Sequence, residues 1–235
     1  MNILGIDTSF LSDTVIGIHI SEEEQLELCL KAPLSQEEKL FVTIDSALQI
    51  LKKQISDIDL FAVGIGPGSF TGIRIGIAAA QALAWTQNKK LIGISSLELL
   101  ALSVPKELIL TDSLIVPVID ARMSRVFSAV FLDEKNISDD LDITPEDLLN
   151  LIKKLPNHNV IMLGDGLKKY ENHFREVSDK KMSFLNHISV SGLAVCRKAF
   201  SILSSNPDND FNPKKVLPLY LRKSEAEVQW ETKNL

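Results

Sequence analysis

Residues 64–76 read GIGPGSFTGIRIG, which places five glycines and one proline in thirteen positions. Glycine loses more conformational freedom on folding than any other residue, so this concentration needs a structural reason. An apolar segment, 60–65, leads into the stretch, and an alanine-rich run follows it. The pattern predicts a strand, a tight loop and a helix from about Thr71 to Trp85. The loop either binds phosphate or connects a strand to a helix that packs unusually close to it.

The stretch does not match two glycine-containing catalytic motifs. A P-loop has the pattern G-x-x-x-x-G-K-[ST], but counting from Gly66 the second glycine and the lysine are replaced by Thr71 and Gly72. A nucleophile elbow has the pattern G-x-S-x-G, but Pro67 and Thr71 stand two residues either side of Ser69. One general property is left, since backbone N–H groups at the start of a helix attract anions.

The helix after the loop carries a stripe without bulky side chains. Gly72, Gly76 and Ala80 recur every four residues, beside the apolar residues Ile73 and Ile77. Each glycine inside a helix costs about 1 kcal/mol, so close packing is expected, either on the chain's own sheet or on a second chain. The segment 37–53 predicts a neighbouring helix with a broad apolar face. The predicted partner-interface residues are Leu40, Phe41, Ile44, Leu48, Gly72, Ile73, Gly76, Ile77 and Ala80.

Other apolar segments predict a chain built from two similar halves. In the first half, we expect an antiparallel meander of strands 2–7, 14–20 and 25–32, the helix and strand already described, a strand at 90–94 and a helix opened by a Ser95–Glu98 capping box. In the second half, we expect strands 114–120, 125–133 and 160–163, a helix with Thr144 as N-cap, and a helix over 191–203.

The two halves repeat two features. A strand ends in an aspartate at Asp7 and again at Asp120, and a strand runs into a glycine loop at 64–68 and again at 163–166. We therefore predict an α/β fold with a duplicated core, in which subdomains 1–106 and 107–235 face each other across a cleft.

The two aspartates allow two interpretations. Across a cleft they could act as an acid–base or Mg²⁺ pair, or each could cap the turn after its own strand. An arginine just after Asp120, Arg122 or Arg125, either pairs with that aspartate or presents charge to a partner. The residues of the possible nucleotide or anion loop are Asp7, Thr8, Gly66, Gly68, Ser69, Thr71 and Asp120.

Composition and local spacing argue against several functions. The net charge is −6, whereas a stand-alone nucleic-acid binder has a basic face. No H-x-x-x-H, H-E-x-x-H or C-x-x-C occurs, so no metal site is expected. Cys29 and Cys196 are expected as buried, reduced thiols. No membrane-length apolar run and no secretory signal are recognised, and a cytoplasmic location is expected.

Six segments together resemble the bacterial TsaB (YeaZ) family. They are NILGIDTS, VGIGPGSFTGIRIGIAAAQALA, ISSLELLA, PVIDARMSRVF, LGDG and PLYLRK, in the family's order between residue 2 and about residue 223. GPGSFTGIRIG is the most specific of them. The resemblance implies an actin-like fold of the acetate kinase–Hsp70–actin (ASKHA) superfamily, in agreement with the duplicated core.

The resemblance also implies a function and partners. It points to a non-catalytic scaffold or activator of the complex that makes threonylcarbamoyladenosine at position 37 of tRNA. Its expected partners are homologues of the transferase TsaD and the ATPase TsaE, which would hold the metal and ATP, so no cofactor is expected here. The two predicted helices, 37–53 and 72–86, would bind TsaD or a second copy in a homodimer, and tRNA would be met only through the complex.

One departure from the superfamily bears on the alternative function. Ala121 and Arg122 stand where active members have a glycine-rich phosphate loop, so tight ATP binding is not expected. The alternative is an ATP-dependent transferase or kinase that acts alone, with Asp7 and Asp120 around a metal-bound nucleotide.

Overall fold

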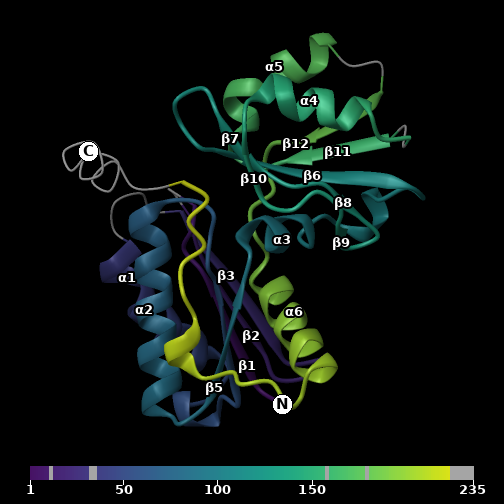
Figure 1. Ribbon diagram of the computed structural model, residues 1–235. Helices are drawn as coiled ribbons and strands as arrows, with labels where there is room; N and C mark the ends of the chain where they lie inside the picture. Colours follow the sequence, from purple (N-terminus) through teal and green to yellow (C-terminus); the bar gives the residue numbers. More distant parts are fainter. Residues whose placement is uncertain (11–12, 32–35, 157–158, 178–179, 223–235) are drawn as a thin grey trace, which may run out of the picture.

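A computed structural model describes residues 1–10, 13–31, 36–156, 159–177 and 180–222 of the chain. The chain forms two α/β halves stacked end to end (Figure 1). In the part that the structure describes, no helix is both long and apolar enough to cross a bilayer.

The first sheet has the strand order β3-β2-β1-β4-β5. β1 (Ile3–Asp7), β2 (Asp13–His19) and β3 (Gln25–Lys31) form the predicted antiparallel meander, and β4 (Leu60–Gly64) and β5 (Lys90–Ile94) add in parallel. This meander and both parallel strands confirm the interpretation of the apolar segments.

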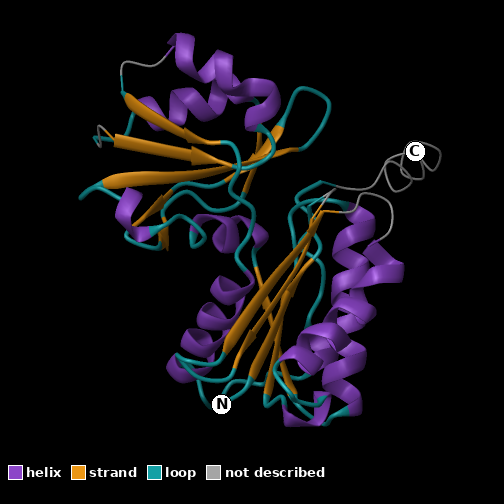
Figure 2. Cartoon of the chain, turned by 180° about the vertical axis from the view of Figure 1, so that it is seen from behind, coloured by secondary structure: helices purple, strands orange, loops and turns teal. Residues whose placement is uncertain are grey.

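Helices cover both faces of the first sheet (Figure 2). α1 (Gln36–Ile50) and α2 (Phe70–Thr86) bury Leu40, Ile44 and Ile73 against one face. α6 (Gly192–Ser205) buries Val195 and Cys196 against the other. Side chains alternate between the two faces of a strand, so neighbouring residues of β1 belong to different cores.

The second sheet repeats the first. Its main order is β10-β7-β6-β11-β12, with the same strand directions as the first sheet, and the short strands β8 and β9 pair beside β6. α4 and α5 cover one face, and α3 lies against the other. The described elements are β6 (Ser113–Asp120), β7 (Val126–Ser128), β8 (Phe131–Leu132), β9 (Lys135–Asn136), β10 (Leu141–Ile143), β11 (Asn159–Leu163), β12 (Lys181–Leu185), α3 (Ser96–Ala101), α4 (Pro145–Lys153) and α5 (Leu167–Val177), with 3₁₀ turns at Ile55–Asp57, Lys106–Leu108 and Pro213–Lys215.

Three local predictions differ from the structure. The expected strand 125–133 is broken, because β7 pairs with the end of β6 whereas β8 pairs with Ile115 nearer its start. The expected capping box is absent, because the hydroxyl of Ser95 donates to Asp140 instead of capping α3. Cys29 is exposed on the edge strand β3, while Cys196 is buried as expected.

The last part of the chain returns to the first half. α6 packs on β1 and β2, and residues 211–219 run along α2 and β5, where the side-chain amide of Gln81 donates to the carbonyls of Pro213 and Val216. One core cluster joins Val15 and Val195 to Ile115 and Ile161. The division into 1–106 and 107–235 stays a prediction, since these segments of the second range pack on the first sheet.

Candidate functional site

Asp7, at the end of β1, is enclosed by its own half of the molecule. Its Oδ1 accepts hydrogen bonds from the backbone N–H and the hydroxyl of Ser9, at 2.8 and 2.6 Å, and its Oδ2 accepts one from Ser96 at 2.9 Å. The side chain is fully buried, and this burial raises the pKa of the carboxyl, against the effect of those hydrogen bonds. An added Cβ on Gly64 would lie 1.9 Å from Oδ2.

The glycine stretch packs directly on the turn after β1. The hydroxyl of Thr8 donates to the carbonyl of Gly72 at 2.7 Å, and a Cβ on Gly76 would lie 2.3 Å from the Thr8 oxygen. The backbone N–H of Ser69 donates to the carbonyl of Ser9 at 2.7 Å. The glycines therefore let the start of α2 approach β1 closely, which was the packing alternative for this stretch.

The other residues of the possible anion loop are mostly engaged. Ser69 is the N-cap of α2 and accepts from Gly72, and the N–H of Gly66 donates to Ser96 at 3.2 Å. Gly68 lies against Ser9, where a Cβ would fall 2.4 Å from the Ser9 carbonyl oxygen. Thr71 is exposed. Anion binding at this loop stays a prediction.

Asp120 repeats the arrangement of Asp7 in the second half. Its Oδ1 accepts from the N–H of Arg122 at 2.9 Å, two residues on, just as Asp7 accepts from Ser9. The N–H of Asp120 donates to Asp165, and Lys169 lies 3.9 Å from its carboxylate. Each aspartate thus caps the turn after its strand, and in the described ranges no hydrogen bond joins the two. Within those ranges no cluster of three or more His, Cys, Asp or Glu side chains is positioned to hold a metal.

A cavity of about 120 Å³ lies between the halves, and neither Asp7 nor Asp120 lines it. Its walls come from both halves, and the hydroxyl of Ser189 donates to Asp13 across it at 2.6 Å. Burial raises the pKa of Asp165, which also lines it. The full lining is Phe10, Asp13, Lys31, Asp165, Lys168, Asn186, His187, Ile188 and Ser189.

Most of the predicted partner-interface residues are buried inside this chain. Phe41 is 51% exposed, but the other eight lie in the core between the first sheet and its two helices. The close packing of the small-residue stripe is on this chain's own sheet, since a Cβ on Gly76 would meet Thr8 and Val63, and a contact of these eight residues with a second chain stays a prediction. The eight buried residues are Leu40, Ile44, Leu48, Gly72, Ile73, Gly76, Ile77 and Ala80.

A different set of apolar residues is exposed on the same two helices. Phe41, Val42 and Ile50 project from α1, and Phe70 and Trp85 from α2, each at least 40% exposed. We call these five residues the α1–α2 face; the two helices that carry them lie on the side of the first sheet opposite α6 (Figure 1). Of these five residues, only Phe41 was among the predicted partner-interface residues. The other four are apolar residues of the same two predicted helices or lie directly beside them.

The two arginines after Asp120 behave differently. Arg125 donates from Nε to Asp142 at 2.7 Å. The side chain of Arg122 is exposed and has no hydrogen bond or ion pair with any residue that the structure describes. Only the backbone of Arg122 reaches Asp120, so the predicted side-chain pairing with this aspartate is not observed.

Comparisons with known proteins agree with the duplicated fold. The family model for TsaD, tRNA N6-adenosine threonylcarbamoyltransferase, matches residues 32–230. A Bacillus subtilis protein, tRNA threonylcarbamoyladenosine biosynthesis protein TsaB, is 26% identical over 98% of both chains. The solved structure of YeaZ from Pseudomonas aeruginosa superposes with a TM-score of 0.77 at 20% identity, over 94% of this chain and 99% of that one. A hexokinase from Thermus thermophilus superposes with a TM-score of 0.51 at 11% identity, over 86% and 100%.

The fold and these likenesses define an α/β protein with the duplicated, actin-like ASKHA core. Its two aspartate turns are held within their own halves. The chain belongs to the TsaB (YeaZ) family, and the TsaD family model matches its residues 32–230.

Replacing Asp7 with asparagine tests the burial of this carboxyl. Burial raises its pKa, so the folded chain keeps the proton to a higher pH than the unfolded chain, whose aspartates titrate near about 3.9. The wild type therefore loses stability from this group as the pH rises between the two pKa values. We expect Asp7→Asn to gain stability relative to the wild type across that interval, measured by urea unfolding from about pH 4 to pH 7.

Asp59→Asn is the control with the opposite sign. A backbone hydrogen bond from Asn2 lowers the pKa of Asp59, so this variant should lose stability relative to the wild type as the pH rises. A stability difference for Asp7→Asn that does not change with pH would contradict the raised pKa.

Proposed function

We propose that the chain is a non-catalytic scaffold that activates a TsaD-type transferase in making threonylcarbamoyladenosine at position 37 of tRNA. The observation that carries the proposal is the pairing of two features. Asp7 is enclosed within its own half and Asp120 caps its own turn, while α1 and α2 expose five apolar side chains. The names of its relatives, TsaB and tRNA N6-adenosine threonylcarbamoyltransferase, supply the reaction.

The proposed partners follow from the same face. Clustered exposed aromatic and aliphatic side chains are typical of the centre of protein–protein interfaces. A TsaD homologue would bind the α1–α2 face, a TsaE homologue would join the complex, and the partners would hold ATP and metal. In isolation, a second copy of the chain would cover the same face as a homodimer.

Reconstitution tests the proposal. The chain is mixed with the TsaD and TsaE homologues of its own genome, and threonylcarbamoyladenosine on tRNA is measured by mass spectrometry of the nucleosides. We expect no product and no ATP hydrolysis from the chain alone, and product only when the chain completes the mixture. Transfer by the chain alone, or full activity without it, would refute the scaffold.

Calorimetric titration of the chain with ATP and Mg²⁺ distinguishes the scaffold from the alternative function, an ATP-dependent transferase or kinase that acts alone. A self-sufficient transferase or kinase would bind nucleotide with micromolar affinity. We expect no binding heat, because hydrogen bonds within each half occupy Asp7 and Asp120.

A further inference from the structure

A group of arginines and aromatic rings lies at the N-terminal end of α2 and the neighbouring loop of the second half. The guanidinium of Arg74 lies 3.9 Å over the ring of Phe70, and its Nε donates to the hydroxyl of Tyr220 at 2.8 Å. Tyr220 stacks on Phe70 with ring centroids 5.0 Å apart. Arg74, Phe70 and Tyr220 are all exposed.

Arg222, two residues after Tyr220, joins this cluster to the second half. Its Nη1 donates to the carbonyl of Ala121 at 3.1 Å, and its Nε and Nη2 donate to both oxygens of Asp142 at 2.8 Å. Asp142 also accepts from Arg125. Burial opposes ionisation of Asp142, but these hydrogen bonds outweigh it and lower its pKa. One carboxylate therefore serves two arginines, which leaves an excess of positive charge.

The loop that Arg222 holds presents a further arginine. Arg122, Met123 and Ser124 all have left-handed backbone conformations, with φ of 58, 48 and 58°. Such conformations cost non-glycine residues roughly 1–2 kcal/mol each, and they concentrate at functional sites. They shape the loop that Arg222 contacts at Ala121 and Met123, and the exposed Arg122 side chain on this loop has no partner among the described residues.

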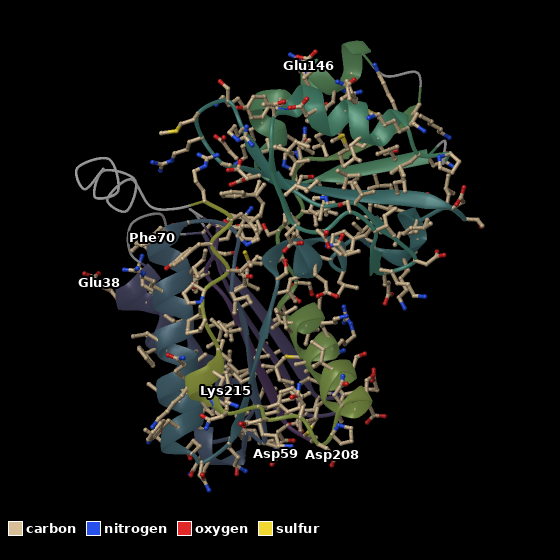
Figure 3. The ribbon with its side chains drawn as sticks, in the orientation of Figure 1. Glu38, Asp59, Phe70, Glu146, Asp208 and Lys215 are labelled. Atoms are coloured by element: carbon tan, nitrogen blue, oxygen red, sulfur yellow. The ribbon has the colours of Figure 1, made fainter. Side chains whose placement is uncertain are left out.

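We infer that Arg74, Arg122, Arg125 and Arg222, with Tyr220, form a contact surface for the phosphate backbone of RNA; we call it the arginine surface, and Phe70 supports it by stacking on Tyr220. Arginine forks match phosphate oxygens, and exposed rings beside them are typical of surfaces that bind single-stranded or looped RNA. The excess positive charge stands out on a chain of net charge −6. Figure 3 shows Phe70 at the end of α2 that is nearer the second half.

This inference rests on the proposed function for its choice of RNA, since the proposed complex acts on tRNA. An acidic protein surface would also complement the positive charge of these arginines. RNA is favoured because the cations are arginines, and one of them, Arg74, stacks on an aromatic ring. The surface would contribute phosphate contacts alongside those of the partner subunits.

Binding of fluorescein-labelled tRNA to the isolated chain tests the inference without any partner. Anisotropy is followed from about 50 to 200 mM salt for the wild type, Arg122→Ala and Arg122→Glu. We expect micromolar binding at the lowest salt, weakened roughly fivefold by Arg122→Ala and further by Arg122→Glu. The slope of log affinity against log salt should fall by about 1 with Arg122→Ala.

Arg197→Ala is the matched control. Arg197 is an exposed arginine on α6, across the first sheet from α2, so its loss removes the same charge and should leave tRNA affinity unchanged. Melting temperatures should stay within about 1 °C for every variant, because neither side chain holds another described group. The expected change is therefore confined to binding.

Three outcomes would overturn the inference. They are no binding by the wild type at 50 mM salt, equal affinity and salt slope for Arg122→Ala and the wild type, and an equal loss in Arg197→Ala. Weaker co-purification of Arg122→Ala with the TsaD homologue, with unchanged tRNA binding, would assign the surface to an acidic protein instead. Reconstituted activity of the wild type in any of these cases would leave the proposed scaffold function intact.

Discussion

Replacing Gly192 with alanine is expected to lower the free energy of unfolding by roughly 3 kcal/mol, the upper end of the cost of overpacking. An added Cβ at this first residue of α6 would lie 2.5 Å from the backbone N of Gly17 and 2.5 Å from the carbonyl carbon of Ile16. Both atoms belong to β2, which is hydrogen-bonded on both sides, to β1 and β3. The backbone therefore has no room to move aside.

The measurement is a thermal and urea unfolding comparison. For a chain of this length, 3 kcal/mol corresponds to a fall in melting temperature of about 10 °C. Phe200→Ala is the control, since Phe200 is on the same helix but 52% exposed, and its loss should change stability by less than about 1 kcal/mol. Equal melting temperatures for Gly192→Ala and the wild type would contradict the backbone contact between α6 and β2.

This contact also shows why a sequence pattern predicts that a residue is buried more readily than it predicts which element packs on that residue. Gly17 lies within an apolar segment that predicts a strand correctly, but nothing in its neighbours indicates that a helix nearly 180 residues later touches its backbone. The same limitation applies at Gly76. The stripe correctly predicts a close approach, while the approaching group, Thr8, comes from this chain rather than a second one.

The first half was predicted well because its signals are local. Alternation, apolar runs and a glycine loop identify β1 to β5, α1 and α2 without knowledge of distant contacts. The second half was harder, because β6 exchanges hydrogen-bonding partners along its length and divides the segment 125–133 between β7 and β8. α5 and β12 were not predicted from the sequence at all.

The candidate sites also differ in whether local sequence patterns or distant contacts determine them. The turns at Asp7 and Asp120 follow from a local rule, a polar residue that accepts from the backbone two residues on, and sequence analysis included this alternative. The arginine surface depends on Tyr220 and Arg222 reaching Phe70 and Ala121, contacts that span about 100 residues or more. No local pattern carries that information.

Replacing Phe41 or Val42 with aspartate is expected to abolish binding of the TsaD homologue without unfolding the chain. Phe41 is 51% exposed and Val42 is 65% exposed on α1, so a charge there costs little in the free chain. Within an interface the same carboxylate would be buried without a counter-charge, and central aromatic residues carry 2 kcal/mol or more of binding energy. We expect a loss of affinity of about 30-fold or more for each variant, measured by calorimetry with the purified partner.

Two further variants make the result specific. Leu108→Asp introduces the same charge at another exposed apolar side chain, 48% exposed in a 3₁₀ turn of the chain outside the α1–α2 face, and should bind the partner normally. Gly76→Leu should lower the melting temperature of the free chain, because the leucine would overlap Thr8. If instead Gly76→Leu left the fold intact and removed partner binding, while Phe41→Asp bound normally, the partner would contact the small-residue stripe rather than the exposed face. The same variants in analytical ultracentrifugation test the homodimer, which Phe41→Asp should dissociate if a second copy uses the α1–α2 face.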